Sequence, residues 1–234
     1  MIIIGHRGAA GRAPENTLPS FALALELGCL WLELDVHLSA DGDLVVIHDA
    51  LLERTTSGRG AVQDHRTFEL QNMDAGGGAA VPTLHEVATL LSHHLQQSPA
   101  KDLTLNIELK GAATGEAVAL FLKQHTLPFA VLISSFDHNE LRRFRKIDSN
   151  TPLAPLYAKW QPNWHETAVE LGATYVNLGN RITTPKRVAE IVEKGLKVCV
   201  YTINNKRRAE RLQRWGVSGV FTDYPDRLGA AGSA

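Results

Sequence analysis

The chain has 234 residues, of which 44% are hydrophobic and 21% are charged. These fractions exclude a disordered or collagen-like chain, and the length favours one large domain over residues 1–234. Lysine and arginine together number 24 and aspartate and glutamate 25, so the net charge is −1 and no global positive field is available to bind nucleic acid.

The N-terminus and the two cysteines bear on the protein's location. The first apolar run, residues 1–4, is far shorter than the core of a signal peptide or a membrane span. Cys29 and Cys199 lie far apart and form no CxxC pair, which fits a reducing compartment and argues against a structural zinc site. We therefore expect a cytoplasmic protein without stable membrane insertion.

Short apolar runs alternate with segments of helical period along the chain. The runs typical of strands are residues 2–5, 30–35, 103–108, 131–134, 152–157, 174–178, 197–202 and 219–222. Helix starts are indicated between them, as where Thr83 with Glu86, and Asp137 with Glu140, have the spacing of a capping box. This alternation predicts an α/β fold, a closed parallel (β/α)8 TIM barrel, with an open doubly wound sheet as the alternative.

One apolar run breaks the alternation. Residues 44–48 follow the second strand after a gap that is far too short for a crossover helix, so parallel pairing is excluded there. The gap contains Asp41-Gly42, the commonest two-residue hairpin turn. We therefore expect the second strand to continue past the barrel rim, turn, and return antiparallel as a β-hairpin extension, which makes the barrel irregular.

The two-residue turn also predicts the register of this hairpin. It places Ala40 opposite Asp43, and Asp35 then lies opposite His48. The glycine-rich residues 50–82 that follow are expected to form a short insertion over the barrel mouth.

Three acidic residues lie in predicted strands, where a parallel barrel normally buries apolar side chains. Glu33 and Asp35 share one face of the second strand because the strand period is two, and Glu108 ends a later strand. If all three face inward at the mouth, a hard divalent cation with oxygen ligands relieves their repulsion. The alternative is a set of strand-end salt bridges with Arg7 and Lys110.

Two histidines arrive at the same rim from different elements. His6 follows the first strand and His48 lies on the returning arm of the hairpin. Imidazoles with a pKa near neutrality can share the roles of general base and general acid. We assign the base to His6 and the acid to His48, because pairing with Asp35 would raise the pKa of His48.

Three further residues are candidates for binding substrate. Arg7 and Lys110 beside a divalent cation make an environment suited to phosphate, although both may simply neutralise the acids. Tyr201 shares the inward face of the seventh strand with Cys199, so it is either an aromatic wall of a pocket or part of the core.

Together these residues belong to a longer series of motifs that runs through nearly the whole chain. In order, the segments are His6-Arg7-Gly8, Pro14-Glu15-Asn16-Thr17, Glu33-x-Asp35, His48-Asp49, Arg54-Thr55-Thr56, Pro82-Thr83-Leu84, Glu108-x-Lys110, Ser134-Ser135-Phe136, Tyr201-Thr202-Ile203-Asn204 and Gly219-Val220-Phe221-Thr222-Asp223-Tyr224-Pro225. The series closely resembles the glycerophosphodiester phosphodiesterase family.

The resemblance implies an irregular TIM barrel that hydrolyses glycerophosphodiesters to sn-glycerol 3-phosphate and an alcohol, with one Mg²⁺ or Ca²⁺ as cofactor. By matching positions it assigns His6 and His48 as the acid/base pair, Glu33, Asp35 and Glu108 as metal ligands, and Arg7 and Lys110 as phosphate contacts. Tyr201 stands where relatives commonly have tryptophan, and the 50–82 insertion is shorter than in many of them. Both departures concern the alcohol and glycerol pockets.

Three alternatives remain at this stage. A lysophospholipase-D-like phosphodiesterase on the same barrel would act on acylated diesters, but the sequence shows no obvious amphipathic or apolar membrane segment. A non-catalytic phosphodiester-binding module would be expected to lack a histidine or an acid, and a sugar-phosphate isomerase has little use for three clustered acids. The expected partner is a small-molecule substrate; the oligomeric state and the choice between water and the glycerol 2-hydroxyl as nucleophile are not determined by the sequence.

Overall fold

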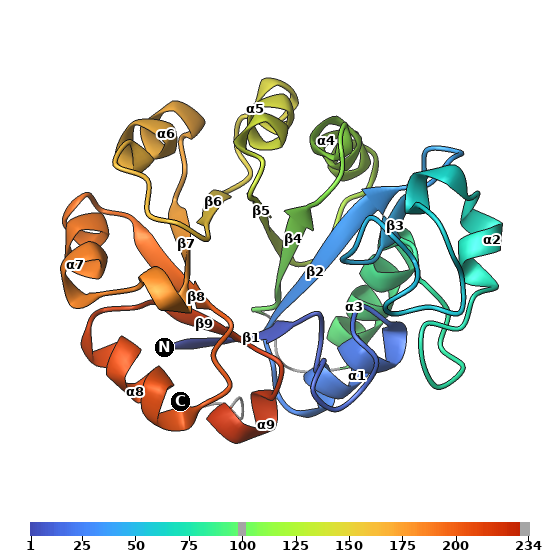
Figure 1. Cartoon of the computed structure of the whole chain (residues 1–234), viewed down its shortest axis with the longest axis horizontal. Helices are drawn as coiled ribbons and strands as arrows, with labels where there is room; N and C mark the ends of the chain where they lie inside the picture. The colour runs from blue at the N-terminus through green and yellow to red at the C-terminus, as the bar shows by residue number, and fades with distance from the viewer. Residues whose placement is uncertain (98–101, 230–234) are drawn as a thin grey trace.

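A computed structural model of the chain describes residues 1–97 and 102–229. Within these residues, eight parallel strands close into a barrel and helices cover its outer surface (Figure 1). The barrel strands are β1 Ile2–His6, β2 Trp31–Leu38, β4 Thr104–Leu109, β5 Ala130–Ser135, β6 Leu153–Tyr157, β7 Tyr175–Gly179, β8 Lys197–Tyr201 and β9 Gly219–Thr222. Pairing of β1 with both β2 and β9 closes the barrel, which confirms the TIM-barrel prediction over the open sheet.

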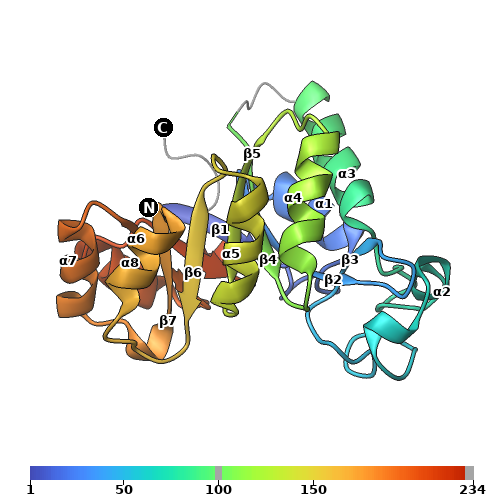
Figure 2. The ribbon, with the colours of Figure 1, turned by 90° about the horizontal axis from the view of Figure 1, so that it is seen from above.

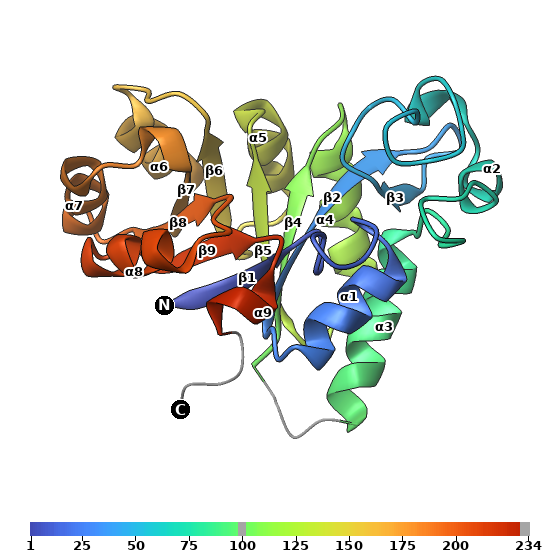
Figure 3. The same ribbon diagram turned by 60° about the horizontal axis from the view of Figure 1, so that its bottom comes forward.

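The helices follow the strands as a (β/α) pattern requires. They are α1 Leu18–Glu26, α2 Thr67–Gln71, α3 Leu84–Gln97, α4 Thr114–Gln124, α5 His138–Ile147, α6 Trp164–Leu171, α7 Pro185–Glu193, α8 Lys206–Arg214 and α9 Pro225–Leu228, with short 3-10 turns at Val62–Asp64 and Asn180–Ile182. Figure 3 shows α1 and α3 side by side on the outside of the barrel.

One of the two predicted capping boxes is present and the other is not. The backbone N–H of Thr83 donates to the Glu86 carboxylate, and Glu86 N donates to Thr83 Oγ1, so this box begins α3. Asp137 accepts from Asn139 N and begins α5, but Glu140 accepts from the backbone of Gly115 at the start of α4. Glu140 therefore joins two neighbouring helices where the sequence predicts a local cap.

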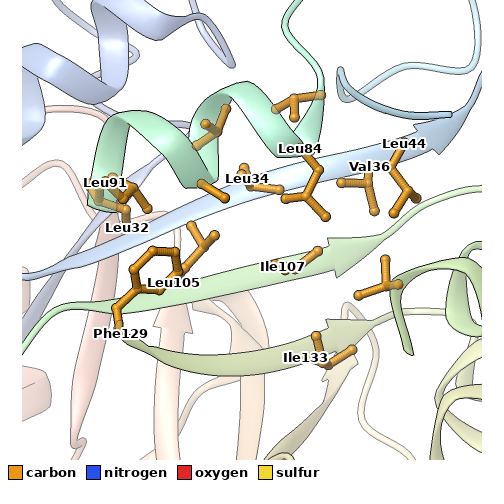
Figure 4. Packing of buried hydrophobic residues seen from close by; sticks show 14 of the residues in the cluster. Leu32, Leu34, Val36, Leu44, Leu84, Leu91, Leu105, Ile107, Phe129 and Ile133 are labelled. Atoms are coloured by element: carbon orange, nitrogen blue, oxygen red, sulfur yellow. The ribbon is translucent and has the colours of Figure 1, made fainter. Parts of the chain in front are cut away.

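The alternation of side chains along β2 separates core from site. Leu32, Leu34 and Val36 face outward and are fully buried against α3, where Leu84 and Leu91 meet them (Figure 4). The residues between them therefore point into the barrel, because successive strand side chains lie on opposite faces. The outer apolar packing thus fixes the inward direction of the acids on this strand.

The lower part of the barrel interior is filled by a small apolar cluster. It consists of Ile4, Leu132, Ala154, Tyr175, Cys199 and Phe221, one from each of six strands, and Tyr201 packs partly against it. This cluster makes the barrel a packed core, with open space only toward the carboxyl ends of the strands.

The hairpin forms, but the predicted register is wrong. β3 Leu44–Val46 pairs antiparallel with β2, with Val36 opposite Val46. Ile47 N donates to Asp35 O at 3.0 Å, so Asp35 lies opposite Ile47, and its expected pairing with His48 does not occur. Figure 2 shows β3 at the edge of the barrel, next to β2.

The error arises from the length of the turn. Ser39 N donates to Asp43 O at 3.0 Å, so three residues, 40–42, form the loop. Gly42 is in the left-handed region at φ +88°, as the last residue of a three-residue loop requires. The Asp41 carboxylate accepts from Ser39 Oγ and Thr67 N, and these bonds hold the longer loop in place.

Residues 50–82 form a compact excursion that begins after the hairpin. It contains α2 and packs Leu52, Val62 and Leu70 against Val45 and Ile47 of the returning hairpin arm. Figure 2 shows this segment at the β3 side of the molecule, away from β6 and β7. The segment therefore has an apolar core of its own.

Candidate active site

Three carboxylates converge inside the barrel at the carboxyl ends of neighbouring strands. Glu33 and Asp35 come from β2 and Glu108 from β4, and the strand register pairs Asp35 with Glu108. Oxygen atoms of the three side chains lie within 4.8 Å of one another. Glu33 and Asp35 are at most 1% exposed, so this is a buried cluster of like charges.

The cluster has unused oxygen atoms. Among the described residues, Glu33 Oε1, Asp35 Oδ1 and Glu108 Oε1 are buried and accept no hydrogen bond. Lys110 Nζ lies 3.3 Å from Asp35 Oδ1 and 2.5 Å from Glu108 Oε1, so the ion pairs expected from the salt-bridge alternative also exist. Glu33 Oε1 has no such partner. Three hard oxygen donors with buried, unsatisfied positions fit one divalent cation.

Burial and mutual repulsion change the ionisation of these acids in opposite directions. Burial, with Asp35 nearby, raises the pKa of Glu108 to about 7 and raises that of Glu33 well above its ordinary value. Burial also opposes ionisation of Asp35, but Lys110 and Arg7 outweigh it and lower its pKa. Asp35 is therefore the carboxylate that the protein's own cations keep charged.

Arg7 connects the first strand to this cluster. Its backbone N–H donates to Glu33 Oε2 at 2.9 Å, which a left-handed backbone at φ +53° permits. Its guanidinium lies 3.1 Å from Asp35 Oδ2 and donates to Glu15 Oε1 at 2.7 Å. Asn16 Nδ2 also donates to Asp35 Oδ2, at 2.8 Å. The segment after β1 thus positions both an arginine and a carboxylate of the site.

Each of the two histidines is paired with its own carboxylate. His6 Nδ1 lies 2.6 Å from Asp223 Oδ1, and His48 Nδ1 lies 2.5 Å from Asp49 Oδ1. Asp223 is held in turn by the Asn204 amide, which donates to its second oxygen at 2.6 Å. A carboxylate on Nδ1 fixes the ring orientation and leaves Nε2 for chemistry. The two histidines line the same cavity, as the sequence predicts.

The argument for assigning the acid to His48 is wrong in its premise. Asp35 is not its partner in the hairpin, and burial lowers the pKa of His48. Asp35 opposes this effect, but Lys110 and Arg7 add to it. The sequence cannot show this balance, because it depends on how deeply the ring is buried among the cations.

Arg54 links the 50–82 excursion to His48. Its guanidinium donates to Asp49 through Nε and Nη2, and to Glu15 at 2.9 and 2.7 Å. These bonds hold the pKa of Asp49 well below its ordinary value. Because Glu15 also accepts from Arg7, an unbroken series of charged contacts connects Arg7 to the partner of His48.

These surroundings were not among the predicted site residues. Glu15, Asn16, Arg54 and Asp223 occur in the motif series, but their spacing in the sequence gives no sign of which group each contacts. The common signal is that each polar side chain stands in a short segment directly after a strand or in the excursion. Loops of that kind carry most functional residues of a barrel.

The cavity that these groups enclose has a volume of about 150 Å³. The residues that line it are His6, Arg7, Glu33, His48, Glu108, Lys110, Ser134, Phe136, Leu156, Tyr201, Thr202 and Phe221. Tyr201 therefore faces the cavity, its ring 5.6 Å from that of Phe136, and Lys110 Nζ lies 5.4 Å from the same phenyl ring. One side of the cavity is charged and the other is aromatic. Asp35 lies behind the charged side.

Residues 6–227 match the glycerophosphoryl diester phosphodiesterase family. The chain belongs to this family. A glycerophosphodiester phosphodiesterase of Caldanaerobacter subterraneus is 34% identical, and the match covers 97% of this chain and 96% of the relative. The Bacillus subtilis protein YhdW is 37% identical, with 97% and 96% covered. The predicted family and enzyme class are therefore confirmed.

A solved structure agrees with the fold as well. The phosphodiesterase of Oleispira antarctica, in complex with the product sn-glycerol-3-phosphate, is 32% identical and superposes with a TM-score of 0.91, covering 97% of this chain and 95% of that chain. None of the helices in the described part of this family member is both long and apolar enough to span a membrane.

Proposed function

We propose that this protein hydrolyses glycerophosphodiesters to sn-glycerol 3-phosphate and an alcohol, with one divalent cation and a pair of histidines. The observation that carries the proposal is one small cavity lined by two carboxylate-paired histidines, two cations and the acidic cluster. Family membership and the product bound to the Oleispira antarctica enzyme support the same substrate class.

The cation would be Mg²⁺ or Ca²⁺, because the three donors are carboxylate oxygens. Glu33, Asp35 and Glu108 would hold it. When bound, it supplies positive charge that polarises the phosphoryl oxygens of the substrate. The unsatisfied oxygen atoms of these side chains are the support for this assignment.

Arg7 and Lys110 bind the phosphate from the charged side of the cavity. Burial opposes their charged forms, but Asp35 and the neighbouring acids outweigh it and raise the pKa of both, so both remain cationic. A guanidinium and an ammonium beside the reacting phosphorus stabilise the charge that builds up there in the transition state. Tyr201 on the aromatic side contacts the glycerol or alcohol arm.

His6 and His48 carry the two proton transfers. One ring accepts the proton of the attacking hydroxyl, and the other donates a proton to the oxygen of the departing alcohol. Asp223 and Asp49 hold the rings by their Nδ1 atoms, so Nε2 is the reacting nitrogen in each. The burial that lowers the pKa of His48 favours its neutral form in the free enzyme.

Incubation with a panel of glycerophosphodiesters tests the proposal. We expect release of sn-glycerol 3-phosphate, measured with a coupled dehydrogenase assay, and no comparable turnover of lysophospholipids. Turnover of lysophospholipids alone would favour the lysophospholipase-D-like alternative. Binding of the diesters without any product would favour the non-catalytic binding module.

Arg54 provides a further prediction, as a positioning residue for His48. Arg54→Gln removes the bonds to Asp49 and Glu15, so the His48 ring loses its fixed orientation. We expect kcat to fall by about 10–100-fold, the usual scale for losing a partner that orients a reacting group, with little change in KM. Steady-state kinetics measure both constants.

The matched control for this variant is Arg59→Gln, which removes an exposed guanidinium from the same excursion. It should leave kcat and KM within about twofold of the wild-type values. Recovery of Arg54→Ala by added guanidinium would identify the missing group as the cause. Equal kcat in Arg54→Gln and Arg59→Gln would remove Arg54 from the mechanism.

A further inference from the structure

A second cavity of about 380 Å³ opens beside the catalytic one. Phe136, directly after β5, and Leu156, in β6, line both cavities. The phenyl ring of Phe136 is 43% exposed and lies between the two spaces. The remaining residues around the second cavity are His138, Tyr157, Ala158, Lys159, Gln161, Asn163 and Thr167. A substrate that extends past the catalytic cavity therefore has a continuous route over Phe136.

The volumes indicate which part of a substrate takes this route. A glycerophosphodiester has two arms on its phosphorus, and the catalytic cavity of about 150 Å³ has room for the phosphate and one small arm. On the opposite side, the cavity beside His48 and Thr55 has a volume of only about 10 Å³. The second arm thus finds space only on the side of β5 and β6, among the cavities in the described residues that adjoin the site.

The second cavity has a polar and positive lining. Lys159 supplies an exposed ammonium, and Gln161 and Asn163 supply exposed amides. No carboxylate lines it among the described residues. The nearest acid in sequence, Asp137, accepts from Asn139 N at the start of α5. The cavity therefore offers hydrogen-bond donors and one positive charge.

This lining is unsuited to a quaternary ammonium group. Such cations are recognised by open aromatic faces or by carboxylates. Tyr157 is 3% exposed, and its ring packs edge-on against His138 at 5.0 Å, so its face is not presented to the cavity. An ammonium head group would meet Lys159 without compensation, because like charges repel.

We propose that this cavity, bounded by Phe136, Lys159 and Asn163, is the subsite for the departing alcohol and that it selects hydroxyl-rich or anionic head groups over choline. The inference rests on the proposed function, because it assigns one arm of the same substrate. Lys159 is the specificity-determining residue, and Phe136 separates the subsite from the reacting phosphate.

The test compares kcat/KM for glycerophosphoinositol and glycerophosphocholine in the wild type, Lys159→Gln and Lys159→Glu. We expect the wild type to favour the inositol substrate at least about fivefold, the scale of one exposed charge near a ligand. Lys159→Gln should reduce this ratio and Lys159→Glu should reverse it. The ratio is the readout, so a general loss of folded enzyme cancels.

Lys123→Glu is the matched control, because it makes the same change in net charge on an exposed lysine of α4 that lines neither cavity. It should keep the wild-type ratio. An unchanged ratio in Lys159→Glu, or an equal change in Lys123→Glu, overturns the subsite while turnover by the wild type keeps the proposed function. A wild type that hydrolyses no diester, methyl glycerophosphate included, overturns both.

Discussion

Chelation with EDTA is expected to abolish hydrolysis of glycerophosphodiesters, and Mg²⁺ or Ca²⁺ is expected to restore it. Glu33, Asp35 and Glu108 place buried oxygen atoms within 4.8 Å of one another, and each side chain keeps one oxygen that accepts no hydrogen bond from the described residues. Without a cation this arrangement is a site of repulsion rather than of catalysis.

The same cluster predicts how stability depends on pH. The pKa of Glu108 is raised from an ordinary value of 4.5 to about 7, so between these values the metal-free native state binds more protons than the unfolded state. The free energy of unfolding of the metal-free protein should therefore fall as pH rises through this window. Because an ion that binds the native state raises its stability and competes with these protons, the gain in Tm on adding Mg²⁺ or Ca²⁺ should be larger near pH 8 than near pH 5.

Single substitutions separate metal binding from folding. Glu108→Ala should weaken the affinity for the ion in calorimetric titrations and leave the metal-free Tm unchanged or higher, since relief of repulsion offsets the lost side chain. Glu26→Ala, which removes an exposed acid from α1, should change neither quantity. Full activity after exhaustive chelation, with no metal-dependent shift in Tm, would return the three acids to the salt-bridge interpretation.

The parts of the site that the sequence predicts well depend on short-range periodicity. Glu33 and Asp35 share a face because the strand period is two, and the apolar residues between them fix which face is outward. Glu108 meets them because parallel strands end at the same rim. Local rules of this kind need no knowledge of distant packing, which is why the barrel and the acidic cluster follow from the sequence.

The parts that the sequence does not predict depend on one extra residue or on distant partners. The hairpin turn is three residues long because Asp41 is held by Ser39 and Thr67, and this moves Ile47 to the place expected for His48. A shift of one residue reverses the face of every side chain on a strand. His48 reaches the cavity nevertheless, because β3 ends at Val46 and the following residues leave the ladder.

The pairing of His6 with Asp223 illustrates the second kind of failure. The two residues are 217 positions apart, and they meet because β9 pairs with β1 to close the barrel. Arg54 is similar, since its bonds to Glu15 join segments 39 positions apart. Spacing along the chain indicates nothing about such pairs until the closure of the barrel and the path of the excursion are known.

Substitution of the histidines is the second prediction with a large effect. His6→Ala and His48→Ala should each lower kcat by about 10²–10⁴-fold, the usual scale for losing a general acid or base, with the folded state retained. Retention of the fold is expected because both side chains are partly exposed at the cavity and neither belongs to the apolar clusters. Circular dichroism and Tm measurements check this point.

The leaving group then assigns the two roles. A p-nitrophenolate departs without being protonated, whereas an alkoxide requires a proton. The variant that lacks the general acid should therefore lose much less activity toward the p-nitrophenyl ester of glycerol 3-phosphate than toward the methyl ester. The variant that lacks the base should lose activity toward both alike. His48 is neutral in the free enzyme because burial lowers its pKa, so it must gain a proton in the complex if it proves to be the acid. Near-normal turnover of the methyl ester by either folded variant would remove that histidine from the mechanism.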